Sequence, residues 1–129
     1  MFPLTRRAML AGLTALVALV ADEKPVKQYT ADELKEVLKN EKNLFFLDVR
    51  EPKELQDTGS IEGYVNIPLG QLESRLKEVP KDKTIITACA RGVRAGKAAA
   101  ILTKNGYNVI GACGLNEWKA KNYPVVYPK

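Results

Sequence analysis

Histidine is absent from this chain of 129 residues, and only two cysteines are present, Cys89 and Cys113. Without histidine, the chain cannot form the Ser-His and Cys-His pairs in which an imidazole activates the nucleophile. Any nucleophilic side chain must therefore be activated by backbone dipoles and fixed charges. Two cysteines without histidine also fall short of the four ligands of a structural zinc site, so we expect neither a metal nor another cofactor.

The chain also lacks a large excess of either sign of charge. The formal net charge is +5, the lysines are scattered among acidic residues, and aromatic residues make up only 7% of the chain. Nucleic-acid-binding domains gather Lys and Arg in one patch, and single-strand binders add stacking aromatics, so we expect no nucleic-acid partner. The length and the 46% hydrophobic content suit one compact domain, and nothing in the sequence indicates its oligomeric state.

A long uncharged run occurs at the N-terminus, where Arg6 and Arg7 precede residues 8–20. This run is short for a bilayer span of about 20 residues, but it has the length of a signal-peptide hydrophobic region. The paired arginines resemble the twin-arginine export signal of bacteria. We therefore predict a periplasmic protein that is membrane-anchored only if the signal stays uncleaved. The predicted divisions are a signal peptide at 1–21, a linker at 22–28 and the domain at 29–129.

After residue 29, short apolar runs alternate with segments of helical spacing. Thr30 and Glu33 form the pattern of a capping box at a helix start. The expected strands are 44–47, 84–88 and 107–110, and the expected helices are 31–40, 51–56, 69–79 and 93–105, followed by a segment at 114–121. This alternation predicts an α/β domain with a mostly parallel sheet and with ligands at the carboxyl ends of its strands.

Two charged residues, Asp48 and Arg50, follow the buried strand at 44–47. A catalytic acid is one interpretation of Asp48. We favour the other, in which Asp48 and Arg50 organise the loop after the strand and pair with neighbours such as Glu54.

Cys89 lies between the expected strand at 84–88 and the expected helix at 93–105. Backbone N–H groups and the positive end of the helix dipole would point at its sulfur there, and Arg91 and Arg94 add two full charges. These effects favour the thiolate, so Cys89 is the candidate nucleophile; two nearby arginines argue against the alternative of a cysteine that only packs in the core. The candidate substrate-binding residues are Ala90, Arg91, Gly92, Val93 and Arg94.

The pattern Cys-x-x-Gly-x-Arg at 89–94 resembles the active-site loop of rhodanese domains, the single-domain sulfurtransferases. Three further stretches resemble this family in the same order, namely 47–52, 59–69, and 114–118 with 123–125. The resemblance covers residues 29–126. It implies a rhodanese-like α/β fold in which helices flank both faces of a mostly parallel sheet.

The same resemblance implies an activity. Cys89 would take a sulfane sulfur from a small anionic donor such as thiosulfate, hold it as a persulfide, and pass it to cyanide or a thiol. Arg91 is similar to the basic residue of thiosulfate-using members. Ser60, Glu62 and Tyr64 depart from the family's Gly-His-Ile-Pro-Gly-Ala stretch, and we expect this departure to weaken local packing rather than activity.

Two other functions stay open. Cysteine phosphatases and the related arsenate reductases hold an oxyanion in a Cys-x5-Arg loop, whereas four residues separate Cys89 from Arg94. This smaller ring suits a single sulfur atom better than a tetrahedral phosphate. A carrier module that stores the persulfide for a partner protein would use the same intermediate as the enzyme.

The second cysteine, Cys113, follows the expected strand at 107–110, so we expect it at the same sheet edge as Cys89. We interpret it as a small apolar residue at a glycine position of the family pattern. The alternative is a reversible disulfide with Cys89, or a resolving thiol that takes sulfur from it.

Overall fold

The computed structural model describes residues 25–129. The predicted signal peptide at 1–21 and the first part of the predicted linker lie outside the described residues. Within residues 25–129, no helix has both the length and the apolar character needed to cross a membrane. Export and anchoring therefore stay predictions.

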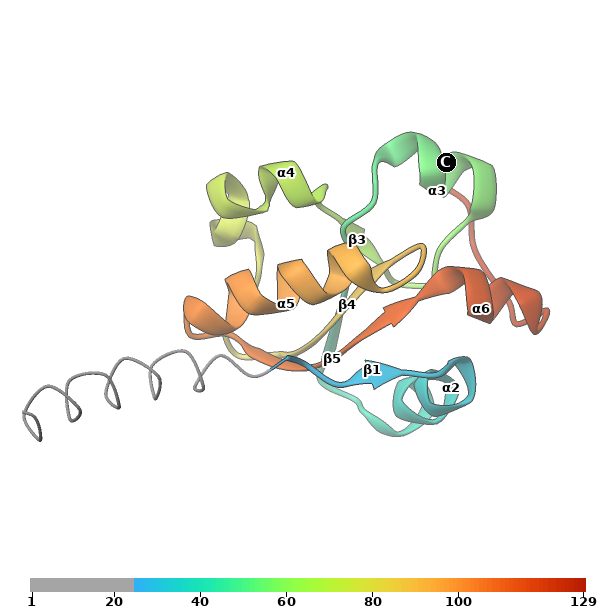
Figure 1. Ribbon diagram of the computed structural model, residues 1–129, viewed down its shortest axis with the longest axis horizontal. Coiled ribbons are helices and arrows are strands. Elements are labelled where there is room, and N and C mark those ends of the chain that lie inside the picture. The colour runs from blue at the N-terminus through green and yellow to red at the C-terminus, as the bar shows by residue number, and fades with distance from the viewer. Residues whose placement is uncertain (1–24) are drawn as a thin grey trace, which may run out of the picture.

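A central sheet of five strands organises the domain, in the order β1-β5-β4-β2-β3 (Figure 1). The strands are β1 (Gln28–Tyr29), β2 (Leu44–Asp48), β3 (Val65–Asn66), β4 (Thr84–Cys89) and β5 (Asn108–Gly114). Every pairing between them is parallel. Because β4 lies in the middle of the sheet, its carboxyl end at Cys89 is surrounded by the ends of its neighbours.

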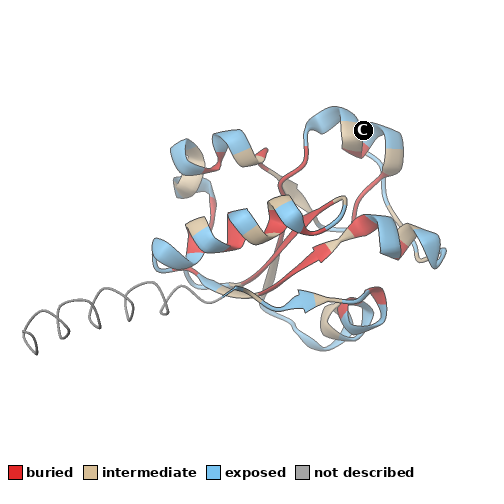
Figure 2. Ribbon diagram, in the orientation of Figure 1, coloured by how far each residue is buried: buried red, intermediate tan, exposed pale blue. Residues whose placement is uncertain are grey.

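Helices cover both faces of this sheet (Figure 1). The helices are α2 (Ala31–Asn40), α3 (Pro52–Thr58), α4 (Leu69–Leu72), the 3-10 helix η1 (Glu73–Glu78), α5 (Val93–Lys104) and α6 (Leu115–Ala120). Successive β4 residues point to opposite faces, so Ile85 packs with Leu102 of α5, and Ile86 packs with Leu34 of α2 and Trp118 of α6. The buried residues accordingly follow the strands and the inner sides of the helices (Figure 2). The predicted rhodanese-like α/β fold is confirmed.

The start of α2 is set by the predicted capping box. The Glu33 N–H donates to the Thr30 hydroxyl at 3.1 Å, and the Thr30 N–H donates to the Glu33 carboxylate at 3.0 Å. Two donors at the helix start are thereby satisfied. This contact fixes where the chain turns from β1 into α2.

The structure departs from the predicted helix at 69–79. That segment forms α4 and then η1, and η1 is kinked at Arg75, whose φ of −120° is not helical. The Ser74 hydroxyl donates to the Gln71 carbonyl at 2.9 Å, which competes with the regular α-helical pattern at this point. The predicted strand at 107–110 also continues to Gly114, and Gln28 of the predicted linker belongs to β1.

Candidate functional site

The loop between β4 and α5 encloses the sulfur of Cys89. The Gly92 and Ala95 N–H groups donate to Cys89 Sγ, at 3.0 and 3.3 Å. Gly92 has a φ of +94°, in the left-handed region that favours glycine, and it directly precedes the first residue of α5. The residue Cys89 is only 1% exposed. The strand end and the helix start therefore supply two backbone donors to a buried sulfur, an arrangement that stabilises a thiolate.

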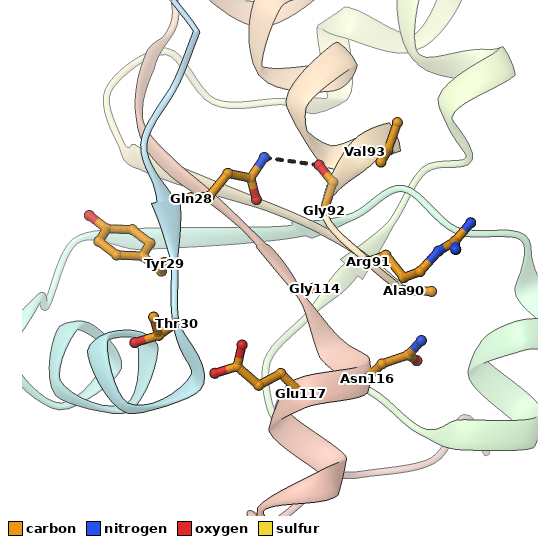
Figure 3. Close-up of a pocket in the computed structure, with 10 residues that line it drawn as sticks. All are labelled: Gln28, Tyr29, Thr30, Ala90, Arg91, Gly92, Val93, Gly114, Asn116 and Glu117. Carbon is orange, nitrogen blue, oxygen red and sulfur yellow. Dashed lines mark hydrogen bonds between the residues drawn. The ribbon is translucent and has the colours of Figure 1, made fainter.

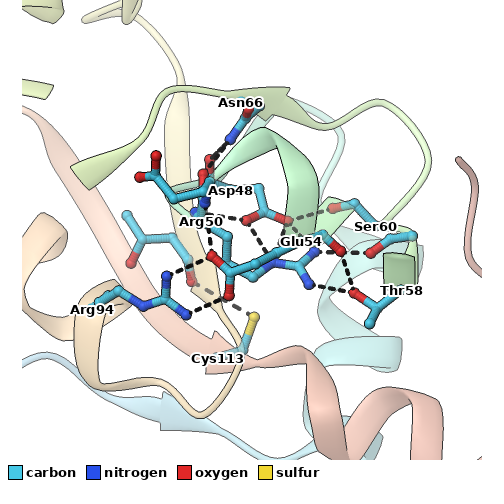
Figure 4. A network of polar contacts seen from close by, with 11 residues as sticks. Asp48, Arg50, Glu54, Thr58, Ser60, Asn66, Arg94 and Cys113 are labelled. Carbon is cyan, nitrogen blue, oxygen red and sulfur yellow. Dashed lines mark hydrogen bonds and ion pairs between the residues drawn. The ribbon is translucent and has the colours of Figure 1, made fainter. Parts of the chain in front are cut away.

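The two arginines of the loop have different surroundings. Arg91 is exposed, and its side chain forms no hydrogen bond or ion pair with any of residues 25–129. Arg94 is half-buried and holds the Glu54 carboxylate of α3 through two hydrogen bonds of 2.8 and 2.9 Å (Figure 4). These bonds raise the pKa of Arg94 and lower the pKa of Glu54 to about 2. Arg94 therefore ties the start of α5 to α3, whereas Arg91 is free to meet a ligand.

A pocket of about 590 Å³ lies beside the loop (Figure 3). Four of the five predicted substrate-binding residues line it, namely Ala90, Arg91, Gly92 and Val93, and Arg94 does not. The other walls come from the end of β1 and the start of α6. Val93 is 64% exposed at the rim. The structure thus gathers the predicted loop residues, except Arg94, around one opening.

A buried ion pair supports the loop that follows β2. Asp48 is 0% and Arg50 2% exposed, and the Arg50 guanidinium donates to the Asp48 carboxylate at 2.6 and 2.9 Å (Figure 4). The guanidinium also donates to Thr58 and to the Gly59 carbonyl, each at 2.8 Å. The prediction that Asp48 and Arg50 organise this loop agrees with these contacts. The predicted pairing with Glu54 was wrong, since Glu54 instead binds Arg94.

Ser60, which stands where the family has a histidine, is held by hydrogen bonds. Its hydroxyl donates to the Asp48 carboxylate at 2.7 Å, and the residue is fully buried. Its backbone forms an antiparallel bridge with Val126. In the described part of the chain, no buried side-chain nitrogen or oxygen lacks a hydrogen-bond partner. The polar groups at Ser60 are therefore satisfied, and the expected weakening of local packing stays a prediction.

The two cysteines lie on neighbouring strands but on opposite faces of the sheet. Cys113 pairs with Ala88, and Cys89 pairs with Gly114. Cys113 packs with the α2 and α6 side, and Cys89 packs with the α5 side. The alternative of a disulfide or a resolving thiol is thus wrong, because the side chains point away from each other across the sheet. Burial also raises the pKa of the Cys113 thiol, which favours its role as a small core residue.

Three residues outside the predicted substrate-binding set hold the loop in place. Gln28 of β1 donates from Nε2 to the Gly92 carbonyl at 3.0 Å, and the Asn116 N–H of α6 donates to the Ala90 carbonyl at 3.0 Å. Gly114 lets β5 approach the loop, because a Cβ there would lie 2.8 Å from the Arg91 carbonyl carbon. The Gly-Leu-x-x-Trp stretch was a signal for Gly114, whereas nothing local pointed to Gln28.

Metal binding has no candidate in the described part of the chain. Between residues 25 and 129, no three His, Cys, Asp or Glu side chains gather closely enough to hold an ion.

Comparison with known proteins gives the family. Residues 30–121 match the sequence model of the rhodanese-like domain, and the chain therefore belongs to that family. It is similar to the mitochondrial thiosulfate sulfurtransferase of Saccharomyces cerevisiae, at 34% identity over 95% of this chain and 93% of the relative. An uncharacterized protein of Bacillus subtilis is 44% identical over 58% of this chain and 60% of its own length, so the chain spans less than two thirds of that relative.

A solved structure supports the same assignment. A rhodanese-related protein of Thermoplasma volcanium superposes with a TM-score of 0.69 at 36% identity, over 78% of this chain and 97% of that chain. Its likeness extends through most of the described domain.

Proposed function

We propose that this chain is a sulfurtransferase in which Cys89 carries the transferred sulfur as a persulfide. The observation that carries the proposal is the buried Cys89 sulfur, which accepts hydrogen bonds from the Gly92 and Ala95 N–H groups. These donors stabilise a thiolate without a base, which is necessary in a chain that has no histidine. The sulfurtransferase name of the yeast relative supports the same class.

Thiosulfate is the proposed donor, and the transfer takes two displacement steps. The Cys89 thiolate attacks the outer sulfur of thiosulfate, the sulfur–sulfur bond of the donor breaks, and sulfite leaves with the bonding electron pair. An acceptor such as cyanide then attacks the outer sulfur of the persulfide. Thiocyanate leaves, and the Cys89 thiolate is restored. Arg91, exposed on the pocket rim, is the cation that meets the incoming dianion.

Phosphatase chemistry fits the site less well. An oxyanion cradle needs several donors directed at the phosphate oxygens and a free guanidinium to neutralise them. Here the loop directs its Gly92 and Ala95 donors at the sulfur itself, and Arg94 is held by Glu54. The site therefore suits storage of one sulfur atom.

The test is direct loading of the purified protein. After incubation with thiosulfate, the peptide that contains Cys89 should gain the mass of one sulfur atom, and cyanide should remove this mass as thiocyanate. Loading without release to cyanide or a small thiol would instead indicate the carrier module. Hydrolysis of para-nitrophenyl phosphate without any sulfur loading would reverse the assignment to a phosphatase.

Substitution should separate the roles of the two arginines. We expect Arg91→Glu to raise the KM for thiosulfate about tenfold with little change in kcat, because the reversed charge repels the dianion during binding. Arg94→Ala should also lower kcat, because it leaves the Glu54 carboxylate unpaired and frees the start of α5. Steady-state kinetics with varied thiosulfate measures both. If both variants changed only KM, and by the same factor, the two arginines would not have the separate roles proposed here.

A further inference from the structure

Gly92 links the sulfur of Cys89 to the start of α5. Its N–H donates to Cys89 Sγ at 3.0 Å, and its carbonyl accepts the Gly96 N–H at 2.9 Å. The same carbonyl accepts a second hydrogen bond, from Gln28 Nε2 at 3.0 Å (Figure 3). Because glycine has the softest backbone of any residue, the direction of the Gly92 N–H depends on how firmly its carbonyl is held.

Gln28 reaches the loop from a fixed position on β1. Gln28 pairs with Ala112 of β5, and the Ala112 N–H donates to the Lys27 carbonyl at 2.8 Å. The carboxamide then lies against two glycines that are one helical turn apart. A Cβ on Gly92 would be 2.5 Å from Gln28 Oε1, and a Cβ on Gly96 would be 3.5 Å from Nε2. The two glycines thus leave room for the flat amide of Gln28.

We infer that Gln28 is a positioning residue for Cys89: its side chain fixes the Gly92 carbonyl and so keeps the Gly92 N–H directed at the sulfur. This inference rests on the proposed function only in taking Cys89 as the nucleophile. Gln28 belongs to β1 and lies just before residues 30–121, the segment that matches the rhodanese-like domain. The contact is therefore made by a residue outside the matched segment.

The chemistry of the site selects an uncharged donor of this length. A glutamate at position 28 would direct carboxylate oxygens at the Gly92 carbonyl, and asparagine is one methylene too short to keep the same contact.

The charged groups around Cys89 and its loop come from elements other than β1. They are Asp48 at the end of β2, Arg50 just after it, Glu54 of α3, Arg91 of the loop, Arg94 of α5, and Glu117 of α6.

Gln28→Met tests the inference, because methionine is uncharged and of similar length but has no N–H donor. The thiolate of Cys89 can be followed by its ultraviolet absorbance against pH, with Cys89→Ser subtracted as the blank. We expect the thiolate signal of Gln28→Met to appear at higher pH, with up to about fivefold less thiolate at a fixed pH below the transition, the factor for complete loss of the Gly92 hydrogen bond to the sulfur. In the sulfur-transfer assay, kcat should fall by a similar factor, and the KM for thiosulfate should change less than about twofold.

Gln56→Met is the matched control, because Gln56 is an exposed glutamine of α3 whose side chain makes no hydrogen bond within residues 25–129. It should titrate and turn over as the wild type does. Gln28→Glu should shift the thiolate signal in the same direction as Gln28→Met.

A thiolate titration of Gln28→Met that coincides with the wild type would overturn the inference, even if the Tm of the variant were lower. The titration needs no sulfur transfer. A wild type that does not load sulfur from thiosulfate would therefore contradict the proposed function, while the titration would still decide the role of Gln28.

Discussion

Cys89→Ser is expected to abolish sulfur transfer from thiosulfate to cyanide, with a loss of at least about 10³-fold in kcat/KM. A serine hydroxyl fits the space of the thiol, but it stays protonated near neutral pH and cannot form a persulfide. The other thiol of the chain, Cys113, cannot replace the Cys89 thiolate, because it lies on the opposite face of the sheet. The variant should keep the fold, because the Gly92 and Ala95 N–H groups can donate to a hydroxyl oxygen as well.

Cys113→Ala provides the control for this result. It removes the other thiol of the chain from the core without touching the loop, so thiosulfate turnover should stay close to that of the wild type. Mass spectrometry after incubation with thiosulfate should show one added sulfur in Cys113→Ala and none in Cys89→Ser. Sulfur transfer that persisted in Cys89→Ser would contradict the whole mechanism.

The sequence was sufficient to predict the centre of the site, because its features are local. An apolar run ending at Cys89, a glycine at 92 and a helix-forming segment after it predict a strand, a left-handed turn and a helix start. The structure has all three in this order, and two backbone N–H groups point at the sulfur. Residue types close together in the sequence were therefore enough to predict the Cys89 loop.

The placement of Cys113 shows what a local pattern does not contain. If β4 and β5 paired without interruption, Ile85 opposite Val109 would bring Cys89 opposite Cys113, on one face. Instead the register shifts by one residue, so that Ile86 pairs with Gly111. An extra residue in one strand moves each later side chain to the other face. This bulge, which the sequence analysis did not predict, separates the two thiols.

The contacts that hold the loop were missed for a related reason. Glu54 is 40 positions from Arg94, and Gln28 is 64 positions from Gly92. Each lies on a different element, and only the sheet order brings them to the loop. An exposed glutamine in a two-residue strand carries no pattern of its own, so its role follows from the contact alone.

The largest loss of stability is expected from Arg50→Met, which leaves the buried Asp48 carboxylate without its cation. Asp48 and Arg50 are almost completely shielded from water, so the unpaired charge cannot be solvated. Breaking such a pair typically costs about 3–5 kcal/mol, a large part of the 5–15 kcal/mol that stabilises a domain of this size. Urea denaturation should show this loss as a lower midpoint at an unchanged slope.

The exposed ion pair of Arg75 and Glu78 gives the matched control, because its geometry is equally good, with 2.7 Å between Arg75 Nε and the carboxylate. Arg75→Met should change the urea midpoint little, since water solvates the remaining Glu78 carboxylate. The double variant Asp48→Leu/Arg50→Met should regain part of the stability lost in Arg50→Met, because it removes the stranded charge, although Ser60 and the Gly59 carbonyl lose their partners. If Arg50→Met were no less stable than Arg75→Met, or if the double variant were the least stable of the three, the buried pair would not support the loop as its contacts indicate.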